Sequence, residues 1–235
     1  MKKLFALVLV ALVAFTPNLL AQTSDIEAKL RAMPTKEYHR AYVGINTVQT
    51  NWNDDLMDAL LDVMFPLKKG ITLGYLRSYN IVEGLPLFVE YGANLQCIFG
   101  RVNASSLFGD EEDVDSDNYN KARTFAVNVP VNASLRLSFN NDELAVTPFV
   151  GLNFRYNLSG KTISVVGDEK TKTNIMDVEE GALKRFQAGL NYGVSVSYDV
   201  YTLSIGSVSD FTSFVDGDEV NGRFNVTTIS LGYAF

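Results

Sequence analysis

Two groups of residues in this chain could do chemistry, namely its histidine and a run of carboxylates. His39 is the only histidine, and imidazole is the usual proton carrier near neutral pH. The carboxylates of residues 110–117 could bind Ca²⁺, because an alternating series of acids begins at Asp113. A calcium loop starting there would need glycine in place of Asn118 and glutamate in place of Thr124. We therefore expect a solvated acidic loop, a structural or solvated histidine, and no metal ion or cofactor.

The charged residues Glu90, Arg136 and Arg155 stand at positions expected to face inward in three neighbouring stretches that alternate between apolar and small polar residues. They occupy polar positions of the third, fourth and fifth such stretches. If the third and fourth stretches pair as antiparallel strands with Leu87 near Leu137, Glu90 comes opposite Arg136 or the polar residue two positions before it. We therefore predict an ion pair in the interior of the fold, where the loss of one partner would leave an uncompensated charge.

Period-two alternation is the main structural signal of the chain beyond residue 38. In residues 85–99 the apolar side chains fall on one face and the polar ones on the other. Strands of soluble proteins average about five or six residues, whereas a tilted strand needs about 9 to 11 to cross a bilayer. The stretches that alternate in this way are residues 38–48, 71–79, 85–99, 125–139, 144–156, 186–198, 200–208 and 223–235. We predict an all-β fold, an eight-stranded antiparallel up-and-down transmembrane β-barrel.

The composition of the polar face indicates which side of the barrel meets lipid, since alternation alone would also fit a soluble lipocalin-like barrel. Every lysine after residue 21 lies outside the predicted strands, and the polar face consists mainly of Gly, Asn, Ser, Thr and Gln. A soluble exterior would carry Lys and Glu, so we expect this face to line a narrow interior and the apolar face to meet lipid. The aromatic residues that predict an interfacial girdle are Tyr79, Phe139, Tyr198, Tyr201 and Tyr233.

The connections between the predicted strands alternate in length. Short turns are expected near residues 82–86, 140–143 and 199, and long loops at residues 49–70, 100–122, 157–184 and 209–222. Short turns at one end and long loops at the other are typical of a bacterial outer-membrane barrel. Residues Asn53 to Phe65 have the pattern of an amphipathic helix, which is either a lid over the barrel mouth or simply loop structure. Pro130 lacks an N–H within the fourth strand and predicts a local bulge.

The N-terminal residues indicate export from the cytoplasm. Residues 1–21 combine a basic start with an apolar run too short for a membrane helix, which is the pattern of a signal peptide. Residues 22–37 would then form a periplasmic segment, either a short helix capped by Ser24 and Glu27 or a disordered tail. The net charge of −7 argues against nucleic acid as a partner. Cys97 is the only cysteine, so no internal disulfide is expected.

The last seven residues alternate and end on Phe235, which resembles the terminal strand by which outer-membrane barrels are recognised for assembly. Further similarity to the PorT-like and OmpA/OmpX-like barrel families lies in residues 71–75, 85–92 and 184–190. The resemblance extends over residues 38–235. It implies a small barrel in the cell outer membrane, in contact with the membrane lipids and inserted by the barrel assembly machinery through Tyr233 and Phe235.

These features favour a structural or surface-interaction role through the long outer loops, with no catalytic activity, for a monomer with an unidentified extracellular partner. A pore for small solutes is the first alternative, although an eight-stranded barrel is filled by its own side chains. A barrel enzyme that modifies lipids or cleaves protein is the second. Such enzymes use histidine near the outer leaflet or outer mouth, whereas His39 stands at the start of the first strand, beside the periplasmic segment.

Overall fold

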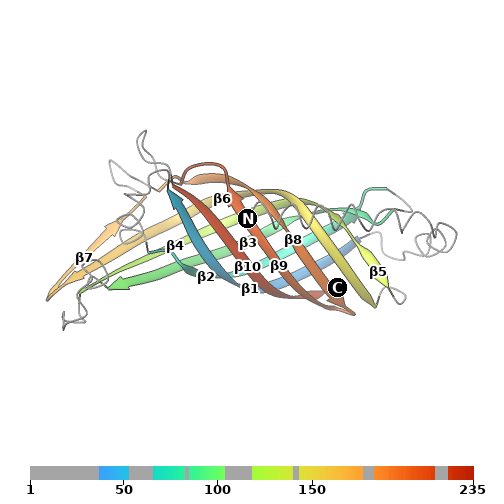
Figure 1. The fold of residues 1–235 in the computed structure, drawn as a ribbon, viewed down its shortest axis with the longest axis horizontal. Coiled ribbons are helices and arrows are strands. Elements are labelled where there is room, and N and C mark those ends of the chain that lie inside the picture. The colour runs from blue at the N-terminus through green and yellow to red at the C-terminus, as the bar shows by residue number, and fades with distance from the viewer. Residues whose placement is uncertain are drawn as a thin grey trace.

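A computed structural model of the chain shows an antiparallel β-sheet closed into a barrel (Figure 1). It describes residues 37–52, 66–82, 85–103, 118–139, 143–176, 183–214 and 222–235. The strands are β1 (Glu37–Trp52), β2 (Lys69–Asn80), β3 (Leu87–Asn103), β4 (Tyr119–Leu135), β5 (Leu137–Phe139), β6 (Leu144–Val166), β7 (Glu169–Asn174), β8 (Phe186–Tyr198), β9 (Tyr201–Asp210) and β10 (Gly222–Ala234). The described residues include no helix long and apolar enough to cross a membrane.

Eight of these strands form the wall of the barrel. They are hydrogen-bonded in the order β4-β3-β2-β1-β10-β9-β8-β6, and β6 also pairs with β4, so the ring is continuous; the first and last strands, β1 and β10, meet within it. The other two strands, β5 and β7, pair only with β6. Every pairing is antiparallel, and β1 pairs with β10 from Arg40 opposite Ala234 to Trp52 opposite Gly222. The predicted eight-stranded up-and-down barrel is confirmed.

The connections confirm the predicted alternation of short turns and long loops. β8 and β9 are joined by residues 199–200, and β5 and β6 by residues 140–143, whereas residues 53–68 join β1 to β2. The predicted long loop of residues 157–184 is wrong in part, because β6 continues to Val166 and folds back as β7. Gly167 makes this turn with a φ of 58°, a backbone conformation that glycine adopts without steric cost.

The fourth predicted strand needs two corrections. It ends at Leu135, and residues 137–139 form the separate short strand β5. Pro130 causes no bulge, since the register shift of β4 against β6 lies between Phe125 and Ala126. Instead, Pro130 interrupts the β3–β4 ladder without changing its register, because the pairing passes from Tyr91 opposite Val131 to the next bonded rung at residues 94 and 128. The missing N–H of proline therefore removes pairing locally and leaves the register of the two strands unchanged.

Large apolar side chains cover the outside of the barrel. Ile45 on β1 is 65% exposed and Leu231 on β10 is 64% exposed. Each of the other wall strands also exposes such a residue, namely Leu73, Leu95, Val131, Leu152, Val196 and Leu203. An apolar band around a closed sheet, with all backbone groups of the wall strands able to pair inside it, is the surface of a transmembrane barrel. Barrels of this type belong to bacterial outer membranes, so the chain is an outer-membrane protein.

The aromatic residues predicted to form a girdle lie together at the short-turn end of the barrel. Tyr79, Phe139, Tyr198, Tyr201 and Tyr233 are all more than half exposed. Tyr201 and Tyr233 contact each other edge to face, with ring centroids 6.0 Å apart. Their position at strand ends fits the interfacial layer, where the ring is apolar and the hydroxyl can be hydrated.

The C-terminal residue is held against the start of β1. The His39 N–H donates to the Phe235 carbonyl at 3.2 Å, and the Phe235 N–H donates to the His39 carbonyl at 3.0 Å. The two rings also stack, with centroids 5.8 Å apart. Phe235 therefore completes the seam at which the two ends of the sheet meet.

We predict that Tyr233→Ser combined with Phe235→Ser lowers the yield of assembled barrel several-fold, measured as the heat-modifiable fraction in membranes. The stability of the molecules that do assemble should fall much less, because aromatic pairs add only about 0.5–1.5 kcal/mol each beyond their area burial. Tyr201→Ser is the matched control, since it removes an equally exposed girdle tyrosine from the interior of the chain. An equal loss of yield in that control would assign the effect to the girdle rather than to the terminal strand.

Candidate functional site

The interior of the barrel is lined by polar side chains from all the wall strands. On each strand they alternate with the lipid-facing residues, as the period-two pattern predicts. The most deeply buried of these residues are Ser78, Glu90, Asn128, Ser134, Thr147, Arg155, Asn157, Gln187 and Ser195. The lumen is therefore the place where this chain concentrates its buried polar chemistry, and it is the candidate functional site.

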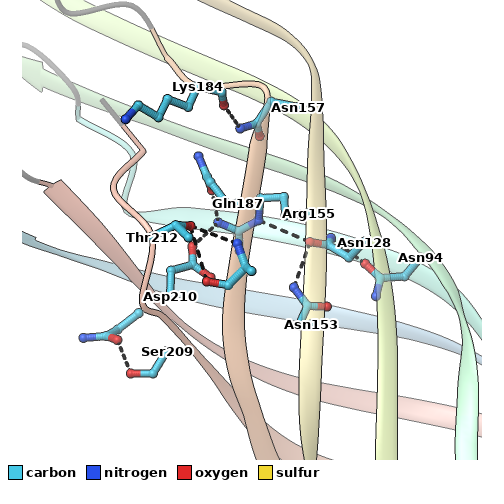
Figure 2. Close-up of polar contacts among 12 residues, drawn as sticks. Asn94, Asn128, Asn153, Arg155, Asn157, Lys184, Gln187, Ser209, Asp210 and Thr212 are labelled. Carbon is cyan, nitrogen blue, oxygen red and sulfur yellow. Dashed lines mark hydrogen bonds and ion pairs between the residues drawn. The ribbon is translucent and has the colours of Figure 1, made fainter. Parts of the chain in front are cut away.

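Figure 2 shows an ion pair between Arg155 on β6 and Asp210 on β9. The pair lies in the outer half of the lumen, because Asp210 is the last residue of β9, at the long-loop end. Their side chains are 2% and 1% exposed, and Arg155 Nη1 lies 2.9 Å from Asp210 Oδ2. The same nitrogen donates to Gln187 Oε1 at 3.1 Å, and Arg155 Nε donates to Asn128 Oδ1 at 3.2 Å. The guanidinium is thus fixed by three strands at once.

Asparagines extend this network along the inner surface of the barrel, from β6 through β4 to β3. Asn153 Nδ2 donates to Asn128 Oδ1 at 3.3 Å, and Asn128 Nδ2 donates to Asn94 Oδ1 at 2.8 Å. Figure 2 shows the chain of contacts running from Asp210 through Arg155 to Asn94. β3, β4, β6, β8 and β9 are therefore linked through side chains as well as through their backbone ladders.

Sequence reasoning identified Arg155 as an inward charge but assigned it no correct partner. Asp210 was missed because the seventh predicted strand, which corresponds to β9, was expected to end at residue 208, and this placed the aspartate in a loop. The signal was present, since Asp210 continues the polar positions of that strand two residues beyond Val208. That signal was weak, because polar Ser207 and Ser209 stand at outward positions and apolar Val208 at an inward one.

Glu90 lies in the other half of the lumen, where it does not pair with Arg136 or Arg155. It accepts hydrogen bonds from Tyr38 at 2.7 Å and from Ser78 at 3.1 Å, and no ion pair of the described residues includes it. The guanidinium of Arg136 lies 4.9 Å from the centre of the Tyr38 ring. Tyr38 thus stands between the two charges that were predicted to meet.

The predicted pair fails because the register differs by two residues. Leu87 pairs with Leu135 and Glu90 with Asn132, so Arg136 falls beyond the end of β4. Its N–H donates to the Pro86 carbonyl at 2.8 Å, which ties it to the short-turn end. The pairing partners were inferred from alternation, and a shift of two residues preserves the alternation.

Arg40 is a further inward charge that sequence reasoning missed. Its Nη1 donates to Ser195 Oγ at 3.0 Å and to Ser204 Oγ at 3.3 Å. These hydrogen bonds cross the interior from β1 to β8 and β9, which are not adjacent to β1 in the ring. The side chain therefore occupies the width of the lumen near the short-turn end.

The outer end of the lumen is filled by an apolar cluster, which we call the plug. It consists of Val48, Leu67, Ile98, Ala122, Ile175, Leu183, Phe214, Phe224 and Val226, all at most 5% exposed. Phe214 and Phe224 stack with ring centroids 4.0 Å apart, and Arg155 lies 5.4 Å from the centre of the Phe224 ring. The plug thus packs directly against the buried ion pair.

Backbone hydrogen bonds hold the segments after β7 and β9 in the barrel mouth. The Ile175 N–H donates to Gly160 at 3.1 Å, and the Leu183 N–H donates to Ile175 at 2.7 Å. The Phe214 N–H donates to Gly222 at 2.8 Å, and the Lys184 N–H donates to Phe214 at 2.7 Å. The plug is therefore built from ordered backbone and not only from side chains that reach inward.

The space left inside the lumen is small. A cavity of about 90 Å³ lies among Arg40, Tyr42, Asn128, Phe149 and Arg155. This is room for a few water molecules, well below the ~300–1,000 Å³ of ordinary ligand pockets. Among the described residues, this cavity can hold structural water but is too small for an organic substrate.

His39 lies outside the lumen, at the short-turn end. Its ring hydrogen-bonds to the Tyr75 hydroxyl, and its Nε2 lies 3.0 Å from Glu37 Oε1. Together with the stack on Phe235, these contacts make it part of the seam between the sheet ends. No group of three or more metal-ligating side chains occurs among the described residues. The acidic run of residues 110–117, the Asn53–Phe65 segment and residues 1–36 lie outside them.

Comparisons with known proteins find distant structural likenesses. No family model matches the chain, and no curated protein matches it. The attachment invasion locus protein Ail of Yersinia pestis is 12% identical with a TM-score of 0.39, over 86% of this chain and 100% of that one. Neisserial surface protein A has 12% identity and a TM-score of 0.40 over 86% and 98%, and a major outer membrane protein of Thermus thermophilus has 13% and 0.44 over 86% and 100%. At such low identities and TM-scores these likenesses support no inference about function.

We predict that Arg155→Gln and Asp210→Asn each lower the free energy of unfolding by about 3 kcal/mol or more, because each leaves one buried charge uncompensated. Denaturant unfolding of the barrel in lipid vesicles, followed by intrinsic fluorescence, measures the change. The double variant should recover part of the loss, as a double-mutant cycle reports for coupled residues.

Arg223→Gln is the matched control for the arginine substitution, since Arg223 is exposed on the outside of β10. It should change the unfolding free energy by less than about 0.5 kcal/mol. Strictly additive losses for Arg155 and Asp210 would contradict the ion pair as the centre of the outer lumen.

Proposed function

We propose that this chain is a non-conducting outer-membrane barrel with a structural or surface-interaction role, carried by its outer end. The observation that supports this most is the plug, which fills the outer end of the lumen above the Arg155–Asp210 ion pair. A barrel that transports solutes needs a continuous water-filled path, and this one fills its path with apolar and paired polar side chains. Any interaction with a partner would therefore take place on its outer surfaces.

The segments that connect wall strands at the outer end of the barrel are longer than those at the short-turn end. The β6–β7 hairpin projects beyond the remaining strands (Figure 1). The connections after β1, β3, β7 and β9 are also at this end, and each is longer than the turn between β8 and β9. Long outer segments on a rigid barrel are a common way to present binding residues.

Catalysis is not part of this proposal. The single histidine is engaged by Tyr75, Glu37 and Phe235 at the short-turn end. A general base needs reach to a bound substrate, and the cavity beside the buried charges holds only a few waters. A membrane-embedded hydrolase or acyltransferase thus has no observation in its favour among the described residues.

Recording from planar bilayers tests the proposal directly. We expect the wild-type barrel to give no stepwise currents, because the plug and the Arg155 network leave no continuous aqueous path. Phe214→Ala combined with Phe224→Ala trims the plug and serves as the comparison, since it removes the stacked pair of rings. Stepwise currents in the wild type that grow when the plug is trimmed would overturn the sealed barrel and establish the pore.

A further inference from the structure

Seven cations gather on one outward face at the outer end of the barrel, although the chain as a whole is acidic. They are Lys69, Arg101, Lys121, Arg123, Lys161, Lys170 and Lys172, all exposed, and we call them the basic patch. The ladders place them in neighbouring positions across β2, β3, β4, β6 and β7. No ion pair of the described residues involves any of them.

Two pairs of like charges stand directly opposite each other in the patch. Arg101 pairs with Lys121 across β3 and β4, and Arg123 pairs with Lys161 across β4 and β6. Like charges at directly opposed positions of an antiparallel sheet are destabilising. An anion bound between them would offset that repulsion, so the arrangement favours a negatively charged ligand.

The patch begins where the apolar band ends. Phe99 is followed two residues later by Arg101, Phe125 is preceded two residues earlier by Arg123, and Leu158 is followed by Lys161. A strand rises about 3.3 Å per residue and is tilted by roughly 40°, so two residues advance it by roughly 5 Å along the membrane normal. Arg101, Arg123 and Lys161 therefore lie at the depth of the lipid headgroups.

The patch also has an aromatic side chain and a hollow. The guanidinium of Arg101 lies 4.0 Å from the centre of the Tyr119 ring, and Lys121 Nζ lies 5.4 Å from it. A hollow of about 620 Å³ is lined by Lys121, Arg123, Lys161 and Lys172 together with the apolar Phe99 and Ile163. Cations beside an apolar edge suit a ligand that carries phosphate on an acyl chain.

We propose that the basic patch binds lipids in the outer leaflet whose phosphate-bearing headgroups carry a net negative charge. Charge complementarity selects an anion, and the position directly above the apolar band selects one that is anchored in the membrane. The inference uses the placement of the barrel in the outer membrane and not the sealed lumen. A conducting barrel that still bound these lipids would overturn the proposed function alone.

The test measures lipid retention by the full-length barrel in dodecyl maltoside, using native mass spectrometry with bisphosphorylated lipid A as the probe. Phosphatidylcholine is the reference lipid, because its headgroup carries no net charge. We expect the wild type to retain lipid A in preference to phosphatidylcholine. Arg123→Gln combined with Lys161→Gln should weaken retention roughly 30-fold, equivalent to about 1 kcal/mol for each cation removed.

Arg223→Gln is the matched control, because it removes an exposed cation from β10, outside the patch. It should leave lipid A retention unchanged, and the folded fraction of each variant is checked by its heat-modifiable mobility. Equal retention by the wild type and the Arg123/Lys161 variant would overturn the proposal. Displacement of lipid A by an equal concentration of inorganic phosphate would also overturn it, since the site would then bind free phosphate as well as it binds the lipid.

The acidic run of residues 110–117, which joins β3 to β4, is the alternative occupant of the patch. Neutralising its carboxylates as Asn and Gln separates the two. If lipid is the occupant, the neutralised chain retains lipid A as the wild type does or more tightly. Retention that appears only after neutralisation would show that the acidic run covers the patch in the native chain, and would overturn the proposal.

Discussion

Closure of the sheet by the pairing of β1 with β10 is the constraint on which the rest of this structure depends. No water is available in a bilayer core to satisfy an open sheet edge, so every strand that crosses it must have two neighbours. The ladder from Arg40 opposite Ala234 to Trp52 opposite Gly222 provides this closure along the whole of β10. At its short-turn end the ladder finishes with two backbone hydrogen bonds between Phe235 and His39, whose rings also stack. The only histidine of the chain therefore helps to hold the first and last strands together.

Closure with eight strands also determines what the interior can contain. A ring of this size leaves room for side chains and little else, and the charges it encloses must find partners within it. Arg155 does so through Asp210, Gln187 and Asn128, whereas Glu90 relies on the neutral donors Tyr38 and Ser78. The plug then removes the outer end of the lumen from solvent. This packing supports the proposed role of the outer surface, where the β6–β7 hairpin extends the sheet beyond the apolar band.

The sequence predicts the strands of this barrel well, because alternation over many residues reports directly which face is buried. It places Ile45, Leu95 and Leu231 on the lipid side and the Gly, Asn and Ser positions inside, as the structure shows. The residues that pair across two strands are harder to predict from the sequence, since a shift of two residues keeps every side chain on its own face. This is why Glu90 was expected beside Arg136 and lies opposite Asn132. The β6–β7 hairpin and Asp210 were missed for another reason, because the alternation there is carried by polar residues and resembles a loop.

The central claim is that odd-numbered residues of β3 face lipid while even-numbered ones face the lumen. Cys97 tests this most directly, because it is the only cysteine and pairs with the lipid-facing Ile71 and with Phe125. A nitroxide attached to Cys97 in reconstituted vesicles should collide frequently with oxygen, which dissolves in the bilayer, and rarely with a water-soluble nickel chelate. The same label at Thr171→Cys in a Cys97→Ser background should collide mainly with the nickel chelate, since Thr171 is exposed on β7, beyond the apolar band. A Cys97 nitroxide that collides mainly with the nickel chelate would contradict the transmembrane barrel.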